Sequence, residues 1–178
     1  ARPAGTGRSP ASKADPRRVA GVPADPALVR RQGGRIEKVE FEKYDVWPDR
    51  GEWLLARIRA WLAGRPEPQD YGLPLALAWE EEGDEKLRPL WPHALAKVRV
   101  KARMGLLYDA FADGRFCQYL VGMIARGARL PLGQGRLRFS ATWRFTELAG
   151  DAPESLPAKR LALDSSNTTI TFGDRLLM

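Results

Sequence analysis

Apolar and polar residues alternate over two stretches of the chain, and each alternation predicts a β-strand. In "RIEKVEFEKYDVW", residues 35–47, Val39 and Phe41 stand between charged neighbours. In "YGLPLALAW", residues 71–79, the larger apolar residues fall on one face and Ala76 and Ala78 on the other. The second pattern is typical of a strand that is covered on both faces.

A helical spacing follows the first of these strands and predicts a helix over residues 49–64. Asp49 is placed to cap its start, with Glu52 as the partner in a capping box, and Gly64 is placed to end it. Its apolar face holds Leu54, Ile58, Trp61 and Leu62. The acidic run "EEEGDE", residues 80–85, lacks the ligand spacing of a calcium loop, so we expect a solvated loop there.

The stretch "KVRVKAR", residues 97–103, is compatible with either a strand or a helix. Read at period two, its four charges share one face opposite Val98 and Val100, as in a strand. Over residues 93–112, however, strong helix formers predominate and two apolar stripes appear at helical spacing. We favour one helix over 93–112, and Gly105 is the main argument against it.

Three further elements are predicted toward the end of the chain. The run "RFCQYLVGMIARG", residues 115–127, predicts a second helix, and a hairpin follows with Gly133 to Gly135 at its tip. The second arm of that hairpin, residues 136–146, is the clearest strand pattern in the chain. It places Leu137, Phe139, Ala141, Trp143 and Phe145 on one face and Arg136, Arg138, Ser140, Thr142, Arg144 and Thr146 on the other. A last hairpin is expected around residues 164–167.

These elements together predict an α+β fold in a single domain, with a mainly antiparallel sheet and about three helices. The body would comprise residues 35–178. Residues 1–34 would form an extended arm in front of it, because they are rich in proline, arginine and glycine and hold almost no large apolar residue before Leu28.

The positive charge of the chain is concentrated in this arm. The net charge is +7, and residues 1–35 carry eight basic groups against two acidic ones, a balance of +6. The other 143 residues carry 21 basic and 20 acidic groups, a balance of +1. The body is therefore close to neutral.

A segment of this composition cannot offset its own ordering entropy, so we expect the arm to lie along a partner. That partner would be nucleic acid phosphate, an acidic protein groove or the surface of a large assembly. The candidate partner-binding residues are Arg2, Arg8, Lys13, Arg17, Arg18, Arg30 and Arg31 in the arm, and Arg136, Arg138 and Arg144 in the body.

We find no catalytic signature in the sequence. His93 is the only imidazole, and a lone histidine is usually structural. The chain has no nucleophile elbow, phosphate-binding loop or cysteine and histidine cluster, so we expect neither a cofactor nor a metal site. The single cysteine, Cys117, lies in an apolar run and is expected to be a buried hydrophobic residue.

Residues 93–147 resemble a winged helix, since two predicted helices are followed by a hairpin tipped with glycine. In that class of fold the second helix enters the major groove and the wing contacts phosphate. The sequence departs from this pattern because its second helix is apolar and offers little beyond Gln118 and Arg126 to base edges.

The function we expect is that of a non-catalytic structural or accessory subunit of a large assembly, such as a ribosome-like particle or a virion. It would contact other protein subunits, and its arm would contact the nucleic acid backbone. The alternatives are an accessory subunit of a protein-only organellar complex and a winged-helix DNA-binding protein. No apolar run is long enough to span a membrane, and a single cysteine forms no disulfide within the chain. We therefore expect a reducing compartment, namely cytoplasm, an organelle matrix or a virion.

Overall fold

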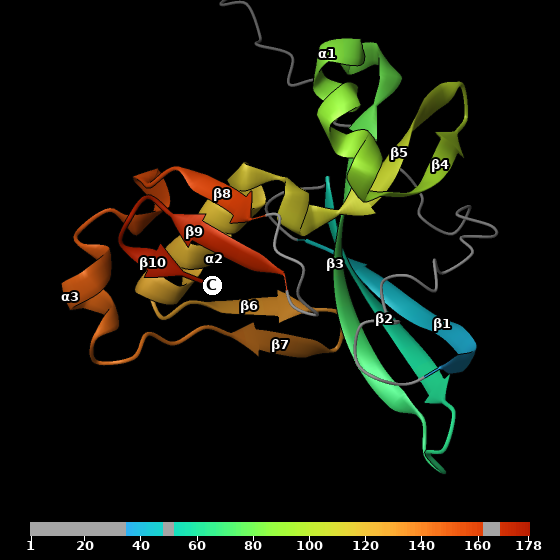
Figure 1. Cartoon of the computed structure of the whole chain (residues 1–178), viewed down its shortest axis with the longest axis horizontal. Helices are drawn as coiled ribbons and strands as arrows, with labels where there is room; N and C mark the ends of the chain where they lie inside the picture. Colours follow the sequence, from blue (N-terminus) through green and yellow to red (C-terminus); the bar gives the residue numbers. More distant parts are fainter. Residues whose placement is uncertain (1–34, 48–51, 162–167) are drawn as a thin grey trace, which may run out of the picture.

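The computed structural model describes residues 35–47, 52–161 and 168–178, and in these residues all paired strands are antiparallel (Figure 1). The strands are β1 (Ile36–Val46), β2 (Trp53–Leu62), β3 (Gln69–Trp79), β4 (Ala94–Val100), β5 (Arg103–Asp109), β6 (Arg129–Leu132), β7 (Gly135–Arg138), β8 (Ala158–Leu161), β9 (Thr169–Phe172) and β10 (Leu176–Leu177). The helices are α1 (Asp84–Leu87), α2 (Gly114–Ala125) and α3 (Phe145–Ala149), with short 3₁₀ turns between elements. The predicted α+β class, with a mainly antiparallel sheet and about three helices, is confirmed.

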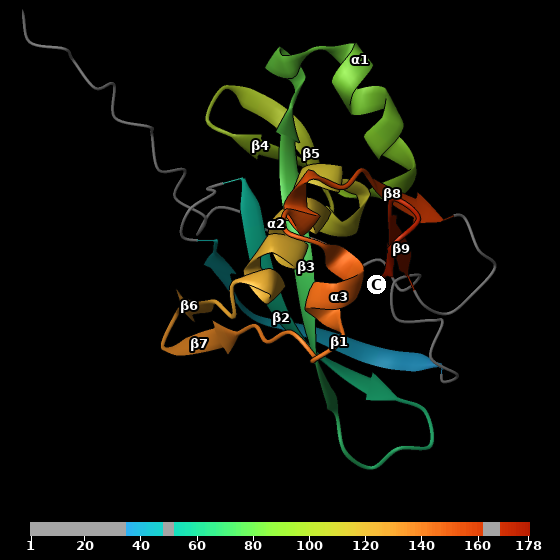
Figure 2. The same ribbon diagram turned by 90° about the vertical axis from the view of Figure 1, so that its left-hand side faces the viewer.

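The largest layer is a five-stranded sheet with the order β1-β2-β3-β5-β4. Strand β3 runs through its middle, pairing with β2 along most of its length and with β5 at its end (Figures 1 and 2). The predicted strands over 35–47 and 71–79 are confirmed as β1 and β3. Leu75 and Ala76 are consecutive residues on opposite faces of β3 and both are buried, so this strand is covered on both faces as predicted.

The helix predicted over 49–64 is wrong, because residues 53–62 form strand β2. Alternate residues of this segment are all buried, and they are Leu54, Ala56, Ile58, Ala60 and Leu62. The period-two pattern is complete only when the two alanines count as apolar, which the helical interpretation did not do. The predicted cap at Asp49 lies outside the described residues.

The helix predicted over 93–112 is also wrong, because this segment folds into the hairpin of β4 and β5. The chain reverses at Lys101, whose φ of 57° places it in the left-handed region used by tight turns. Val98 is buried while Lys97 and Arg99 are exposed, so the alternation in "KVRV", residues 97–100, is that of a strand. The rest of the stretch does not continue it, because Lys101 and Ala102 form the turn and Arg103 begins β5.

Gly105 explains why strand pairing prevails over helix propensity in this segment. It lies opposite Trp79 of β3, and a Cβ atom at this position would overlap the carbonyl oxygen of Ala78 and would stand 2.9 Å from Cε3 of the Trp79 ring. Only glycine lets β5 approach β3 this closely. The residue that argued against a helix is therefore the one that permits the sheet.

The helix predicted over 115–127 is confirmed as α2, which lies between two sheets. Phe116 and Met123 pack against the five-stranded sheet, where the Phe116 ring stands edge-on to Trp47 and Trp53 at centroid distances of 5.5 and 5.2 Å. Cys117 and Val121 pack on the opposite side against a three-stranded sheet with the order β10-β9-β8. The core is thus built on both sides of one helix.

Burial gives Cys117 the character that the sequence predicted. The side chain is 1% exposed, and burial raises the pKa of its thiol to about 12. Because the thiolate is the reactive form, this thiol is protonated and inert near neutral pH.

The hairpin predicted around Gly133 is confirmed as β6 and β7, but the long strand predicted over 136–146 is wrong. Strand β7 ends at Arg138, and helix α3 begins at Phe145. The register pairs Arg129 with Arg138, so residue 140 would need a partner at Gly127. Gly127 belongs to the turn that ends α2, with φ of 57°, and no strand exists there to continue the ladder.

The last predicted hairpin is confirmed by the pairing of β8 with β9, and its expected turn at 164–167 lies outside the described residues. The acidic run 80–85 is not a loop, because it forms a 3₁₀ turn and the start of α1, although its carboxylates are exposed as expected. Among the helices of the described residues, none combines the length and the apolar character that crossing a lipid bilayer requires.

We predict that Gly105→Ala destabilises the chain by about 1–3 kcal/mol, because the new methyl group overlaps backbone that cannot move without breaking the β3–β5 pairing. Urea unfolding measures the change. The control is Gly72→Ala, where the new Cβ would meet only Leu55 Cδ1 at 3.6 Å and the stability should change by less than about 1 kcal/mol. Equal unfolding midpoints for the two variants would contradict this account of β5.

Candidate functional site

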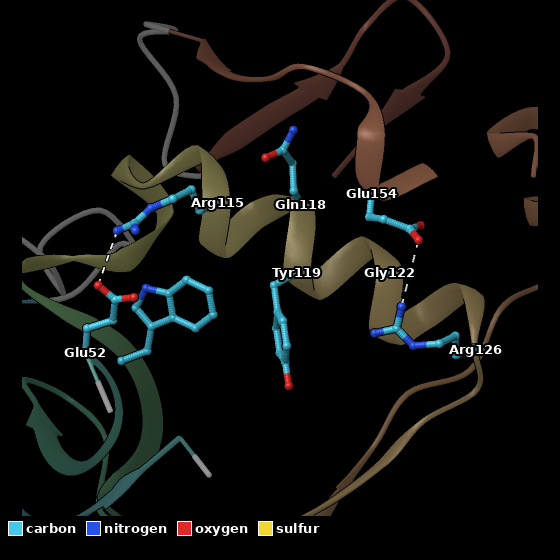
Figure 3. Close-up of a pocket in the computed structure, with 8 residues that line it drawn as sticks. Glu52, Arg115, Gln118, Tyr119, Gly122, Arg126 and Glu154 are labelled. Atoms are coloured by element: carbon cyan, nitrogen blue, oxygen red, sulfur yellow. Dashed lines mark hydrogen bonds and ion pairs between the residues drawn. The ribbon is translucent and has the colours of Figure 1, made fainter. Parts of the chain in front are cut away.

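A groove of about 390 Å³ runs along the exposed side of α2 (Figure 3). Its lining residues are Glu52, Trp53, Arg115, Gln118, Tyr119, Gly122, Arg126 and Glu154. An ion pair stands at each end, with Arg115 Nη2 3.4 Å from Glu52 Oε2 and Arg126 Nη1 4.0 Å from Glu154 Oε1. Both pairs are largely exposed, so each contributes little to stability.

The start of α2 is fixed by Asp113, whose side chain is almost wholly buried. One carboxylate oxygen accepts a hydrogen bond from the backbone N–H of Arg115 at 2.9 Å and so caps the helix. The other accepts from the indole N–H of Trp53 at 3.3 Å and from Arg115 Nη2 at 3.1 Å. This one carboxylate therefore joins α2 to β2 and orients the arginine at the near end of the groove.

The two carboxylates of the groove belong to separate ion pairs, which lie at its two ends (Figure 3). Their partners Arg115 and Arg126 stand eleven residues apart on α2, about 16 Å along the helix axis. The groove therefore offers charges and hydrogen-bonding groups at both of its ends to a bound molecule.

His93, the only histidine, lies away from this groove. The pKa of its imidazole is lowered, first by burial and then by the nearby Arg160 guanidinium. Arg160 of β8 itself binds Asp109 at the end of β5, with 2.6 Å between Nη1 and Oδ2. This partly buried ion pair links the five-stranded sheet to the three-stranded sheet, and we interpret the cluster as structural.

The β6–β7 hairpin presents a second candidate site, which we call the arginine face and define as Arg129, Arg136 and Arg138. In the hairpin register, Arg129 lies directly opposite Arg138, and Pro131 lies opposite Arg136. These residues share the exposed face, while Leu130 and Leu132 are buried on the other. Two like charges directly opposite each other destabilise a strand pair.

The arginine face gathers, on one face of one hairpin, three arginines without acidic partners in the described structure. Other basic residues of the body, such as Arg65 and Arg88, also form no ion pair with a described residue, but they lie on separate elements. Within residues 35–47, 52–161 and 168–178, none of its three arginines forms an ion pair with a carboxylate. By contrast, ion pairs are formed by Lys38, Arg59, Lys86, Arg103, Arg115, Arg126 and Arg160. The hairpin therefore holds charge that the described structure does not use.

The structure places the predicted binding residues in three groups. Those of the arm, which are Arg2, Arg8, Lys13, Arg17, Arg18, Arg30 and Arg31, lie outside the described residues. Arg136 and Arg138 belong to the arginine face. Arg144 does not continue that face, because the strand has ended, and its guanidinium lies over the ring of Trp143 at 5.2 Å.

Sequence analysis missed Arg129, although a signal for it was present. A two-residue turn at Gly133 and Gln134 pairs residues 132 and 135, and the same register brings 129 opposite 138. The hairpin was predicted, but its register was not followed back to the first arm.

Comparison with known proteins finds no protein-family model that matches the chain and no curated protein with significant similarity to it. Among the described residues, moreover, no cluster of histidine, cysteine, aspartate and glutamate is suited to hold a metal ion. The function must therefore be argued from the geometry of the groove and of the arginine face.

We predict that Asp113→Ala lowers the free energy of unfolding by about 2–3 kcal/mol, because α2 loses its cap and the buried Trp53 indole loses its acceptor. Urea unfolding provides the measurement. Asp113→Asn keeps an oxygen acceptor and should lose less. Asp84→Ala, at the exposed start of α1 where no side-chain cap forms, should change stability by less than about 0.5 kcal/mol. An unchanged midpoint for Asp113→Ala would refute the proposed link between α2 and β2.

Proposed function

We propose that the chain is a non-catalytic accessory subunit of a larger assembly and that its arginine face contacts the phosphate backbone of nucleic acid. The observation that carries this proposal is the set of three exposed arginines on one face of a short hairpin, without acidic partners among the described residues. Guanidinium groups bind phosphate oxygens through two parallel N–H donors, so several arginines on one strand face suit a chain of phosphates.

Two arginines placed opposite each other in the hairpin oppose folding and favour the binding of an anion. The pair of Arg129 and Arg138 costs stability, on the order of 0.5 kcal/mol, and an anion between the two guanidinium groups would remove that cost. The leucines on the buried face hold the backbone of the hairpin against the core, so binding has to order the arginine side chains but not the strands that carry them.

Contact through phosphates would be independent of base sequence. The first helix of the winged-helix pattern is not present, because residues 94–109 form the β4–β5 hairpin. The basic residues of the arm would add phosphate contacts of the same kind. Their sequence supports this contribution, which stays a prediction.

We predict that the triple variant Arg129→Gln, Arg136→Gln and Arg138→Gln weakens binding to a fluorescent 20-nucleotide strand by about tenfold or more at moderate salt. Each lost phosphate contact also lowers the slope of log K against log salt concentration by about 0.7–0.9. Fluorescence anisotropy titrations at several salt concentrations measure both quantities.

The matched control for this experiment removes the same charge elsewhere. Arg65→Gln, Arg88→Gln and Lys159→Gln alter three exposed cations in the β2–β3 turn, after α1 and on β8. This control should keep most of the affinity and slope. Equal losses in the two triple variants, or no binding by the unaltered chain, would defeat the proposal.

A protein partner is the second candidate, and the edge strand β10 favours it. The other sheet edges are protected by charge, with Glu40 and Lys43 on β1 and Lys97 and Arg99 on β4. Strand β10 carries no charge, and Leu177 is 71% exposed. Ile170 exchanges both backbone hydrogen bonds with Met178, so the N–H and C=O of Leu177 point away from β9 toward the open edge. A strand of a neighbouring subunit could pair there, as in a protein-only complex.

The second candidate can be tested with a second copy of the chain as the partner, whose own β10 edge would pair with the first. We predict that Leu177→Lys abolishes this self-association. Two antiparallel edges are self-complementary, so the unaltered chain should associate as concentration rises in sedimentation velocity runs. Leu148→Lys, which adds the same charge at an exposed position on α3, is the control and should still associate. A monomeric unaltered chain at high micromolar concentration would count against an adhesive edge.

A further inference from the structure

The most exposed large apolar side chain in the described residues is Trp143, at 84%. An indole normally buries a large apolar area, and here the ring contributes almost none of it to the core. The guanidinium of the neighbouring Arg144 lies 5.2 Å from the ring centroid. Trp143 thus holds an aromatic surface that the described fold does not use.

Trp143 lies on the segment that continues directly from the arginine face. After Arg138, residues 139–144 lead without regular structure from β7 to α3, on the same side of the molecule as the hairpin (Figures 1 and 2). Trp143 lies five positions after Arg138 in the sequence, which limits the separation of their Cα atoms to about 18 Å. This reach corresponds to about five stacked nucleotides at 3.4 Å each.

The early end of β7 also explains why the ring of Trp143 is exposed. A strand continuing to residue 146 would have placed Trp143 on the face opposite Arg138 and buried it. Strand β7 ends at Arg138, and the backbone N–H of Phe139 donates one more hydrogen bond to the carbonyl of Ala128 at 2.9 Å. Beyond that bond the chain leaves the hairpin, and Trp143 is exposed beside the cation of Arg144. A charged surface and an exposed ring on one segment are the two elements that single-strand binders combine.

We propose that the chain prefers single-stranded over duplex nucleic acid, with Trp143 stacking on one unpaired base while the arginine face holds the backbone. This inference rests on the proposed contact with nucleic acid. Arg144 lies over one face of the ring, and the base would stack on the other, so that the ring is held between a cation and a base. In a duplex the faces of the bases are already stacked on one another, and the ring has no base to receive.

The test compares a fluorescent 12-nucleotide thymidine strand with the matching 12-base-pair duplex. We expect the unaltered chain to bind the single strand more tightly, and Trp143→Ala to weaken that binding by about 5- to 100-fold while duplex affinity changes less than about twofold. Trp143→Phe keeps an aromatic face and should lose less. A 12-nucleotide abasic strand should bind the unaltered chain and Trp143→Ala equally, because it has no base to stack.

The matched control is Trp91→Ala. Trp91 is 50% exposed and also carries a cation over its ring, Lys97 at 5.1 Å, but it lies in the turn before β4, away from the hairpin. This variant should bind both probes as the unaltered chain does.

The possible failures are distinguishable. Equal affinity of the unaltered chain for the two probes, an equal loss on both probes for Trp143→Ala, or the same loss for Trp91→Ala would overturn the single-strand inference and leave the phosphate contact intact. Absence of binding to either probe would overturn the proposed function itself.

Discussion

The burial of α2 between two sheets is the constraint on which the rest of the described structure depends. A helix of twelve residues is marginal in water by itself, and this one is fixed by packing on two opposite sides. Asp113 sets where the helix begins and ties it to β2. Gly127 sets where it ends, and that end determines where β6 begins and how far β7 can pair. The positions of the groove, the arginine face and Trp143 all follow from this one helix.

The sequence allowed the fold class, α2, β1, β3 and two of the hairpins to be predicted, because their patterns are local and complete. It misled over 53–62 because alanine was treated as neutral, whereas Ala56 and Ala60 are among the most buried residues of the sheet. The helix predicted over 93–112 was wrong because helix propensity is a property of single residues. The close approach of β5 to β3 at Gly105 depends instead on a partner far along the chain. Both segments form strands because of contacts with distant parts of the chain, and a local sequence pattern carries no information on such contacts.

The candidate site was predictable to a smaller extent. Arg136 and Arg138 were identified from composition and hairpin pattern, but the face they form with Arg129 depends on register, which is a property of two strands together. Trp143 was predicted to lie in a strand because nothing in residues 139–146 indicates that their pairing partner is missing. The information lies in the helix that precedes them, whose final turn occupies the place where a paired strand would have to run.

The net charge of the body is a poorer guide to a binding site than the ion pairs formed by its individual residues. The body of the chain is near neutral, yet its acids pair with single basic residues on separate elements, while the three arginines grouped on the arginine face have no acidic partner among the described residues. An exposed indole and opposed arginines each cost an isolated chain stability or solubility, and the described fold offsets neither. A ligand with both negative charge and an aromatic face would remove the two costs together. Its binding would then be coupled to the stability of the hairpin, because any ligand that binds only the folded state shifts the folding equilibrium toward it.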